Sequence, residues 1–115
     1  MKNIQITSRL KIHEGKLDAF KKLANECIVA VKEKEKNTLQ YDWFFNEDQT
    51  ECVVREKFKD SDAVMVHIGN VGDLVGQMIA ISEYLTPEIY GNPSEEVLEA
   101  AAPLHPRIYS FYQGI

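Results

Sequence analysis

The middle of the chain constrains the fold most, because it reads as strand, turn, strand and helix in immediate succession. Residues 39–45 alternate large apolar side chains with polar ones, although Phe44 breaks the pattern. Alternation resumes over residues 51–58, and the polar segment 46–50 between them is predicted to be a hairpin loop. Asp60 and Ser61 then offer an N-cap to a helix that carries His67. This order is one half of a split β-α-β arrangement.

The flanking segments supply the other elements. Apolar side chains alternate over residues 4–12, which predicts a strand, and an apolar stripe with steps of three and four predicts a helix over residues 17–34. Further strands are predicted over 85–90, with Pro87 at a sheet edge, and over 107–112, with a helix capped by Ser94 between them. We expect an α+β fold in one domain over residues 1–115, with a ferredoxin-like antiparallel sheet and helices on one face.

Three glycines interrupt the helical spacing around and after His67. Gly69, Gly72 and Gly76 lie among apolar residues that recur at helical intervals, and each costs about 1 kcal/mol relative to alanine inside a helix. We therefore predict a break near Gly69 and Asn70, with a second helix running to about residue 81. Close approach of a ligand or of a partner's backbone is the alternative interpretation.

Charge and composition exclude several classes of partner. Thirteen basic and eighteen acidic residues give a net charge of −5, whereas nucleic acids and anionic membranes both require a basic patch. The first residues lack the apolar run of a signal peptide, and no stretch approaches the ~20 apolar residues of a membrane span. We expect a cytoplasmic protein. Cys27 and Cys52 fit neither a disulfide framework nor a zinc site.

A sheet that carries helices on one face leaves the other face bare in a monomer. Two such sheets packed face to face would bury it, so we expect a homodimer. The aromatic second strand would then line the space between the sheets. The tail strand is predicted to leave its own sheet and to pair with the edge of the partner's sheet.

At this level the chain resembles the antibiotic biosynthesis monooxygenase (ABM) domain family, whose members form a dimeric α/β barrel. The resemblance covers most of the chain and rests on residues 39–42, on the segment from Val54 to Asp60 and on the helix start from Ser61 to His67. The segment 89–96 is similar to the tails of some members. Some relatives oxidise quinols or polyphenols with molecular oxygen and no metal, flavin or other prosthetic group. Others degrade haem or isomerise a small phosphorylated signalling molecule, and many have no known activity.

His67 is the best single candidate for chemistry. It shares a helical stripe with Val64, Ile68 and Val71, so it is predicted to point towards the sheet. Its ordinary pKa of ~6.5 suits removal of a proton from a phenol near neutral pH, and the resemblance places a histidine here in many members. The alternative is a core histidine that is satisfied by a backbone carbonyl.

Four other residues complete the candidate site. Trp43 and Tyr41 share one strand face and could stack on a flat aromatic substrate, or they could simply pack a dimer core. Arg55, opposite in phase to the apolar residues of its strand, could stabilise a phenolate, or it could form a salt bridge to an acidic neighbour. Asn3 matches, by position only, an early asparagine of the haem-degrading relatives.

The sequence therefore leaves three functions open. The first is a cofactor-independent monooxygenase that acts on a small electron-rich aromatic and oxygen, with His67 and Arg55 as catalytic residues and Trp43, Tyr41 and Asn3 binding substrate. The second is a non-enzymatic dimeric module that binds a small ligand. The third is an isomerase of a small phosphorylated metabolite. No metal is expected, since the three histidines lack the spacing of metal ligands. That the protein needs no cofactor is what the resemblance to the quinol-oxidising relatives implies.

Overall fold

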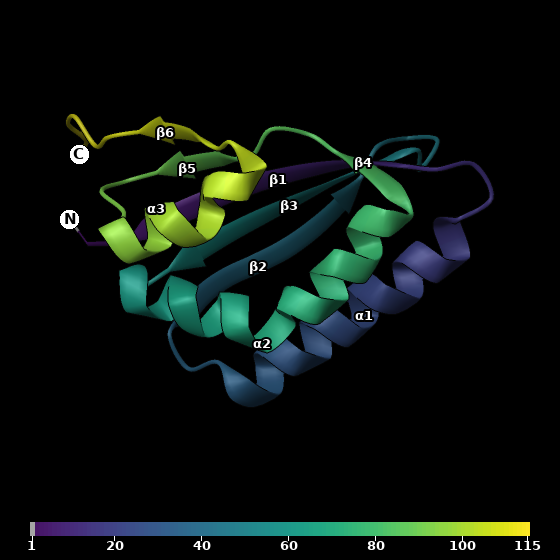
Figure 1. The fold of residues 1–115 in the computed structure, drawn as a ribbon, viewed down its shortest axis with the longest axis horizontal. Helices are drawn as coiled ribbons and strands as arrows, with labels where there is room; N and C mark the ends of the chain where they lie inside the picture. Colours follow the sequence, from purple (N-terminus) through teal and green to yellow (C-terminus); the bar gives the residue numbers. More distant parts are fainter. Residues whose placement is uncertain (1) are drawn as a thin grey trace.

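A six-stranded sheet forms the base of the fold, and helices pack against one of its faces (Figure 1). The computed structural model describes residues 2–115. The strands are β1 (Ile4–Ile12), β2 (Thr38–Phe45), β3 (Glu51–Phe58), β4 (Ser82–Tyr84), β5 (Glu88–Tyr90) and β6 (Arg107–Tyr109). The helices are α1 (Leu17–Lys34), α2 (Ser61–Ala80), α3 (Glu95–Ala101) and the short 3₁₀ helix η1 (Ala102–Leu104).

The strand order is β2-β3-β1-β5-β6, so β1 lies at the centre of the sheet. One side of β1 pairs antiparallel with β3, and the other side pairs antiparallel with β5 and then with β4. β2 pairs antiparallel with β3, while β6 is parallel to β5. The predicted α+β, ferredoxin-like fold is confirmed.

Elements with an uninterrupted pattern form where the sequence predicts them. β1, α1 and β3 have the predicted bounds, and β2 begins one residue earlier. α1 buries Phe20, Ala24, Cys27 and Val31, which follow one another at helical steps of four, three and four. Every second residue of β3 is buried, from Cys52 to Phe58. These faces meet between the sheet and the helices.

The predicted break in the second long helix is wrong, because α2 runs without interruption from Ser61 to Ala80. The Asp60 side chain caps it as predicted, by accepting a hydrogen bond of 2.9 Å from the Ala63 backbone N–H. α2 buries Val64, Val71 and Met78 among others, and this burial outweighs the propensity cost of the three glycines.

By length and composition alone, α2 could also cross a membrane, since it has 20 residues with a mean hydropathy of 1.2. The expectation that no segment reaches this limit is therefore wrong. A buried core helix passes the same test, and α2 packs on α1 and on the sheet. This packing accounts for the buried part of α2, which is 28% of its apolar window.

Two predictions about the later strands need correction. Of the strand predicted over 85–90, only residues 88–90 form a strand, β5, while the sequence pattern missed β4, which ends just before this range. Pro87 lacks a backbone N–H, and its carbonyl accepts a hydrogen bond of 2.9 Å from Arg107. The tail strand ends at Tyr109 instead of Tyr112, and it pairs with β5 of its own sheet.

The interior consists of two clusters of buried residues. The larger one lies between α1, α2 and the central strands, and it includes Leu10, Phe20, Cys52 and Met78. The smaller one joins the start of β1, the end of β3, the start of α2, β5 and α3 around Phe58. Residues of both clusters line a cavity that lies between them. The core therefore has a gap at the place where α2 crosses the sheet.

The face of the sheet away from the helices is exposed. Phe44 is 52% exposed there, and Tyr90 stacks on Tyr109 at a ring distance of 5.2 Å. An ion pair of 3.2 Å joins Arg9 to Glu88 on the same face. Both faces of β2 carry aromatic side chains, as the sequence predicts.

Candidate functional site

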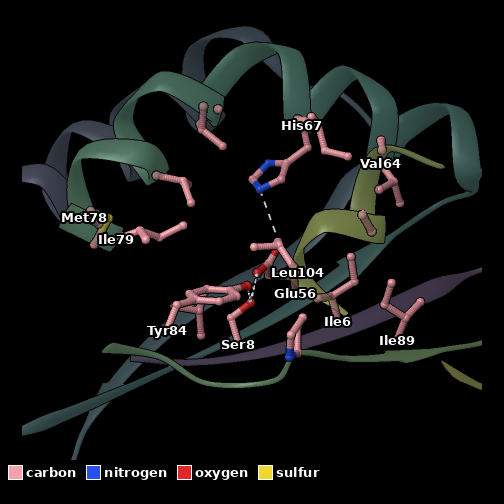
Figure 2. A pocket seen from close by; sticks show the side chains of 18 of the residues that line it. Ile6, Ser8, Glu56, Val64, His67, Met78, Ile79, Tyr84, Ile89 and Leu104 are labelled. Carbon is pink, nitrogen blue, oxygen red and sulfur yellow. Dashed lines mark hydrogen bonds and ion pairs between the residues drawn. The ribbon is translucent and has the colours of Figure 1, made fainter. Parts of the chain in front are cut away.

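A cavity of about 300 Å³ separates the helix-covered face of the sheet from α2, α3 and η1. Its wall is mostly aliphatic, with contributions from β1, β3, α2 and β5. Polar side chains gather at one part of this wall (Figure 2). They are Ser8 from β1, Glu56 from β3, His67 from α2 and Tyr84 from β4. A few convergent polar groups in an apolar cavity are typical of a small-molecule site.

Two carboxylates hold the His67 ring, which is only 7% exposed. Nδ1 lies 3.0 Å from Glu35 Oε1 and 3.1 Å from Glu35 Oε2. On the other side of the ring, Nε2 lies 3.3 Å from Glu56 Oε1. Figure 2 shows His67 descending from α2 towards Glu56, which rises from the sheet. The partners of this buried histidine are therefore two carboxylates, instead of the backbone carbonyl of the alternative interpretation.

Glu35 is the more fully bonded of the two carboxylates. It follows the last residue of α1, and its side chain is 1% exposed. Besides His67, it accepts hydrogen bonds from Asn70 Nδ2 at 2.8 Å and from Thr38 Oγ1 at 2.5 Å. With its lone pairs occupied in this way, Glu35 can fix the orientation of His67 but offers little to a ligand.

Glu56 is bonded more weakly and lines the cavity. Apart from the 3.3 Å contact with His67, it receives one hydrogen bond from the described residues 2–115, from Ser8 Oγ at 3.5 Å, which is at the limit for such a bond. A buried carboxylate needs more partners than this to offset the cost of its desolvation. Glu56 therefore has acceptor capacity that a substrate O–H could fill.

The electrostatics of the cluster favour a charged imidazole. Burial by itself would lower the pKa of His67, but the contact with Glu56 and the nearby charge of Glu35 outweigh burial, so the pKa is raised. The imidazolium then lies between two carboxylates. Counted by formal charges, two carboxylates and one imidazolium leave one surplus negative charge in the cluster.

A hydroxyl pair extends this cluster across the sheet. Ser8 Oγ lies 2.9 Å from Tyr84 Oη, and Ser8 in turn contacts Glu56. Burial raises the pKa of Tyr84 to about 12, although its hydrogen bond to Ser8 opposes the shift. Tyr84 is therefore a neutral phenol near pH 7, able to donate to a ligand or to pass a proton towards Glu56.

Two aromatic side chains of β2 continue the wall beside His67. The Tyr41 ring packs edge to face against the His67 ring, with 5.1 Å between the ring centroids, and against the Trp43 ring, with 5.5 Å between the centroids. Within residues 2–115, the buried Trp43 Nε1 has no hydrogen-bond partner. An unpaired buried donor costs about 1–3 kcal/mol, and a ligand oxygen could relieve this cost.

Comparison with known proteins now decides the family. The sequence profile described as antibiotic biosynthesis monooxygenase matches residues 4–70, which is more than half of the chain. The chain belongs to this family. The match spans Glu35, Glu56 and His67 but ends before Tyr84.

Solved structures support the same fold. MupZ from Pseudomonas fluorescens superposes with a TM-score of 0.87 at 20% sequence identity, covering 100% of this chain and 94% of that one. A protein from Caulobacter crescentus CB15, provisionally assigned as an antibiotic biosynthesis monooxygenase, gives 0.66 at 22% identity, covering 76% and 85%. A protein from Nitrosomonas europaea with the same provisional assignment gives 0.68 at 14% identity, covering 79% and 90%. No match was found among curated proteins.

The structure brings three of the five predicted site residues together. His67, Tyr41 and Trp43 all line the cavity. Tyr41 and Trp43 face the helices, whereas Phe44 of the same strand lies on the bare face of the sheet, where a dimer partner would pack. Arg55 is exposed on the opposite face of the sheet, in register with Asp42 of β2.

Asn3 also lies outside the cavity. It precedes β1, and its backbone carbonyl faces Gly91, where an added Cβ would come within 2.7 Å. The positional match with haem-degrading ABM proteins therefore brings no asparagine side chain to this site. Both nitrogens of His67 face carboxylates, so neither is free to bind haem iron. Within residues 2–115, no group of three or more His, Cys, Asp or Glu side chains is placed to hold a metal ion.

Sequence reasoning missed four polar residues of the site: Glu35, Glu56, Ser8 and Tyr84. Glu56 carried a signal, because it shares the phase of the buried residues Cys52, Val54 and Phe58 on its strand. A charged residue on the buried phase of a strand is uncommon unless it has a partner.

Proposed function

We propose that this ABM protein is a cofactor-independent monooxygenase that oxidises a small electron-rich aromatic, such as a quinol or polyphenol, with molecular oxygen. One observation carries the proposal: the Glu35–His67–Glu56 cluster lies at the wall of an otherwise apolar cavity. The family match supports the reaction class.

The first step is loss of the substrate's phenolic proton to Glu56. This carboxylate has free acceptor capacity, and protonation removes the surplus negative charge of the cluster as the substrate becomes an anion. The His67 imidazolium, held by Glu35, stabilises the phenolate that forms. The proton-accepting unit is thus the His67–Glu56 pair, in place of a free imidazole.

The electron-rich anion then reacts with oxygen directly. Four electrons leave the quinol, a ring carbon gains one oxygen atom, and the O–O bond breaks. The second oxygen atom departs as water after it receives two protons, the one held on Glu56 and one from the other hydroxyl group of the quinol, so a quinol and oxygen yield a hydroxyquinone and water. The apolar wall excludes bulk water from the reactive anion, and Trp43 and Tyr41 bound the space beside it.

The test is oxygen consumption by metal-stripped protein with a panel of reduced quinols and polyphenols. We expect uptake by the wild type, and at least a hundredfold loss in Glu56→Gln and in His67→Ala, in line with general acid–base catalysis. Glu51→Gln is the matched control, because Glu51 lies on the same strand but does not line the cavity. Uptake that survives both site substitutions would reject the proposed base.

A second candidate is a binding module that uses the same cavity without turnover. The apolar wall and the unpaired Trp43 Nε1 favour ligand binding whether or not chemistry follows. Trp43 is the sole tryptophan of the chain, so its fluorescence reports binding directly. A fluorescence response without oxygen uptake across the panel would favour this function.

The third candidate, an isomerase of a phosphorylated metabolite, loses its support. It requires a cationic pocket, but Arg55 lies on the opposite face and His67 is already paired with two carboxylates. A dianionic phosphate beside Glu56 would meet repulsion.

We also propose that the chain forms a cytoplasmic homodimer through the exposed sheet face. Phe44, Tyr90 and Tyr109 lie there beside charged groups of both signs. Size measurement in solution tests this assembly, and a stable monomer at micromolar concentration would reject it.

A further inference from the structure

The cavity opens between α2 and the α3–η1 segment. Most of its lining residues are buried or half-buried, but a few are exposed and so mark its mouth. They are Ile68, Gly72 and Gly76 on α2, and Ala100 and Leu104 across from them. The three α2 residues are spaced by four, so they follow one line along the helix.

Neither the packing nor the backbone conformation of the chain requires glycine at the two glycine positions of this mouth. A Cβ added at Gly72 or Gly76 would meet nothing within 4 Å, so neither position is needed for close packing. Neither has a positive backbone φ that would favour glycine. Each nonetheless weakens the helix by about 1 kcal/mol relative to alanine. The chain therefore accepts a less stable α2 and gains only open space at the cavity mouth.

The cavity wall also changes from polar to apolar along the axis of α2. Glu56 meets His67 at one part of the wall, as Figure 2 shows, whereas Met78 and Ile79 lie farther along α2. From His67 to Gly76 the helix advances about 14 Å. This length exceeds what a single aromatic ring occupies.

From these observations we propose that Gly72 and Gly76 determine substrate specificity by admitting an unbranched apolar arm. The substrate class is an acidic aromatic head that carries an alkyl or acyl chain. The head lies at Glu56 and His67, and the chain runs along α2 past Gly72 and Gly76, opposite Leu104. This inference rests on the proposed function for the placement of the head.

The test uses hydroquinones that carry methyl, propyl or hexyl groups. Binding is measured without oxygen by Trp43 fluorescence, so that it is separated from turnover. In the wild type, we expect affinity to rise about fourfold for each added methylene until the mouth is filled. In Gly72→Leu and in Gly76→Leu, we expect hexylhydroquinone to bind at least tenfold more weakly, while methylhydroquinone binds within twofold of wild type.

Gly69→Leu is the matched control. Gly69 lies on the same helix with nothing within 4 Å of an added Cβ, but it does not line the cavity. All three leucine variants are expected to fold, because leucine is the better helix former and the positions are open. We expect Gly69→Leu to keep the dependence on chain length of the wild type.

The outcomes separate this inference from the proposed function. Wild-type affinity that does not change with chain length overturns the inference, and so does chain-length dependence that survives Gly72→Leu and Gly76→Leu. Oxygen uptake alongside such a result leaves the monooxygenase intact. Chain-length-dependent binding without oxygen uptake has the opposite meaning: the arm is supported and the monooxygenase is rejected.

Discussion

Replacing His67 with leucine tests the electrostatic account of the site most directly. The substitution keeps an apolar side chain of comparable bulk but removes the cation between Glu35 and Glu56. Two carboxylates with side-chain exposures of 1% and 9% then lack their shared counter-charge. Breaking a buried ion pair typically costs about 3–5 kcal/mol, which is a large part of the roughly 5–15 kcal/mol that stabilises a domain.

The assay is urea unfolding followed by circular dichroism, at pH 7 and at pH 5. We expect His67→Leu to lose about 3–5 kcal/mol at pH 7, which corresponds to a fall of roughly 12–20 °C in Tm for a chain of this size. The loss should persist at pH 5, because the raised pKa of His67 makes its contribution to stability complete below pH ~6.5.

A second substitution serves as the control. Adding Glu56→Leu to His67→Leu removes one of the two buried carboxylates that lack a counter-charge, while Glu35 keeps its hydrogen bonds to Asn70 and Thr38. The double variant should recover more than half of the lost stability. A loss below about 1 kcal/mol that is equal at both pH values would refute the reasoning, since it would mean that His67 does not balance buried charge.

Three further predictions concern the rest of the molecule. Because the pKa of His67 is raised on folding, its contribution to stability is complete below pH ~6.5 and is lost as pH rises through the folded-state pKa. The unfolding free energy of the wild type should therefore fall as the pH is raised above ~6.5, and that of His67→Leu should lack this decline. Asp60→Ala removes the acceptor for the Ala63 N–H and should cost about 1 kcal/mol in urea unfolding; an unchanged midpoint would mean that water replaces this cap. Burial raises the pKa of Cys27 to about 11 and that of Cys52 to about 12, so a thiol reagent at pH 8 should label neither cysteine until urea is added, and rapid labelling of the native protein would contradict their burial.

Much of the fold could be predicted from sequence because three of its segments carry unbroken periodicity. β1, α1 and β3 have the predicted bounds, since their inward positions are apolar with few exceptions. For α2 the same reasoning predicted a break that is absent. Local helix propensity counts the cost of Gly69, Gly72 and Gly76, but it does not count the burial of Val71 and Met78 against the sheet, whose strands come from other parts of the chain. Tertiary packing decided that helix.

The site was predictable only in part, for a related reason. His67, Tyr41 and Trp43 lie on inward phases of their elements, and in the structure all three line the cavity. Glu56 could have been found as a charge on a buried phase. Glu35 could not, since it belongs to the alternating charge run 32–36, and only the point at which α1 ends determines which of those charges turns inward.

The polar cluster also bears on how the chain folds. Glu35 and His67 are 32 residues apart, Ser8 and Glu56 are 48 apart, and Ser8 and Tyr84 are 76 apart. Contacts between such distant segments form late and slowly, because the intervening chain must first be ordered. No fragment that ends before β4 contains the whole cluster. A refolding chain should therefore regain helix signal well before it regains ligand binding, and a local opening at any of these elements should inactivate the site before the protein unfolds.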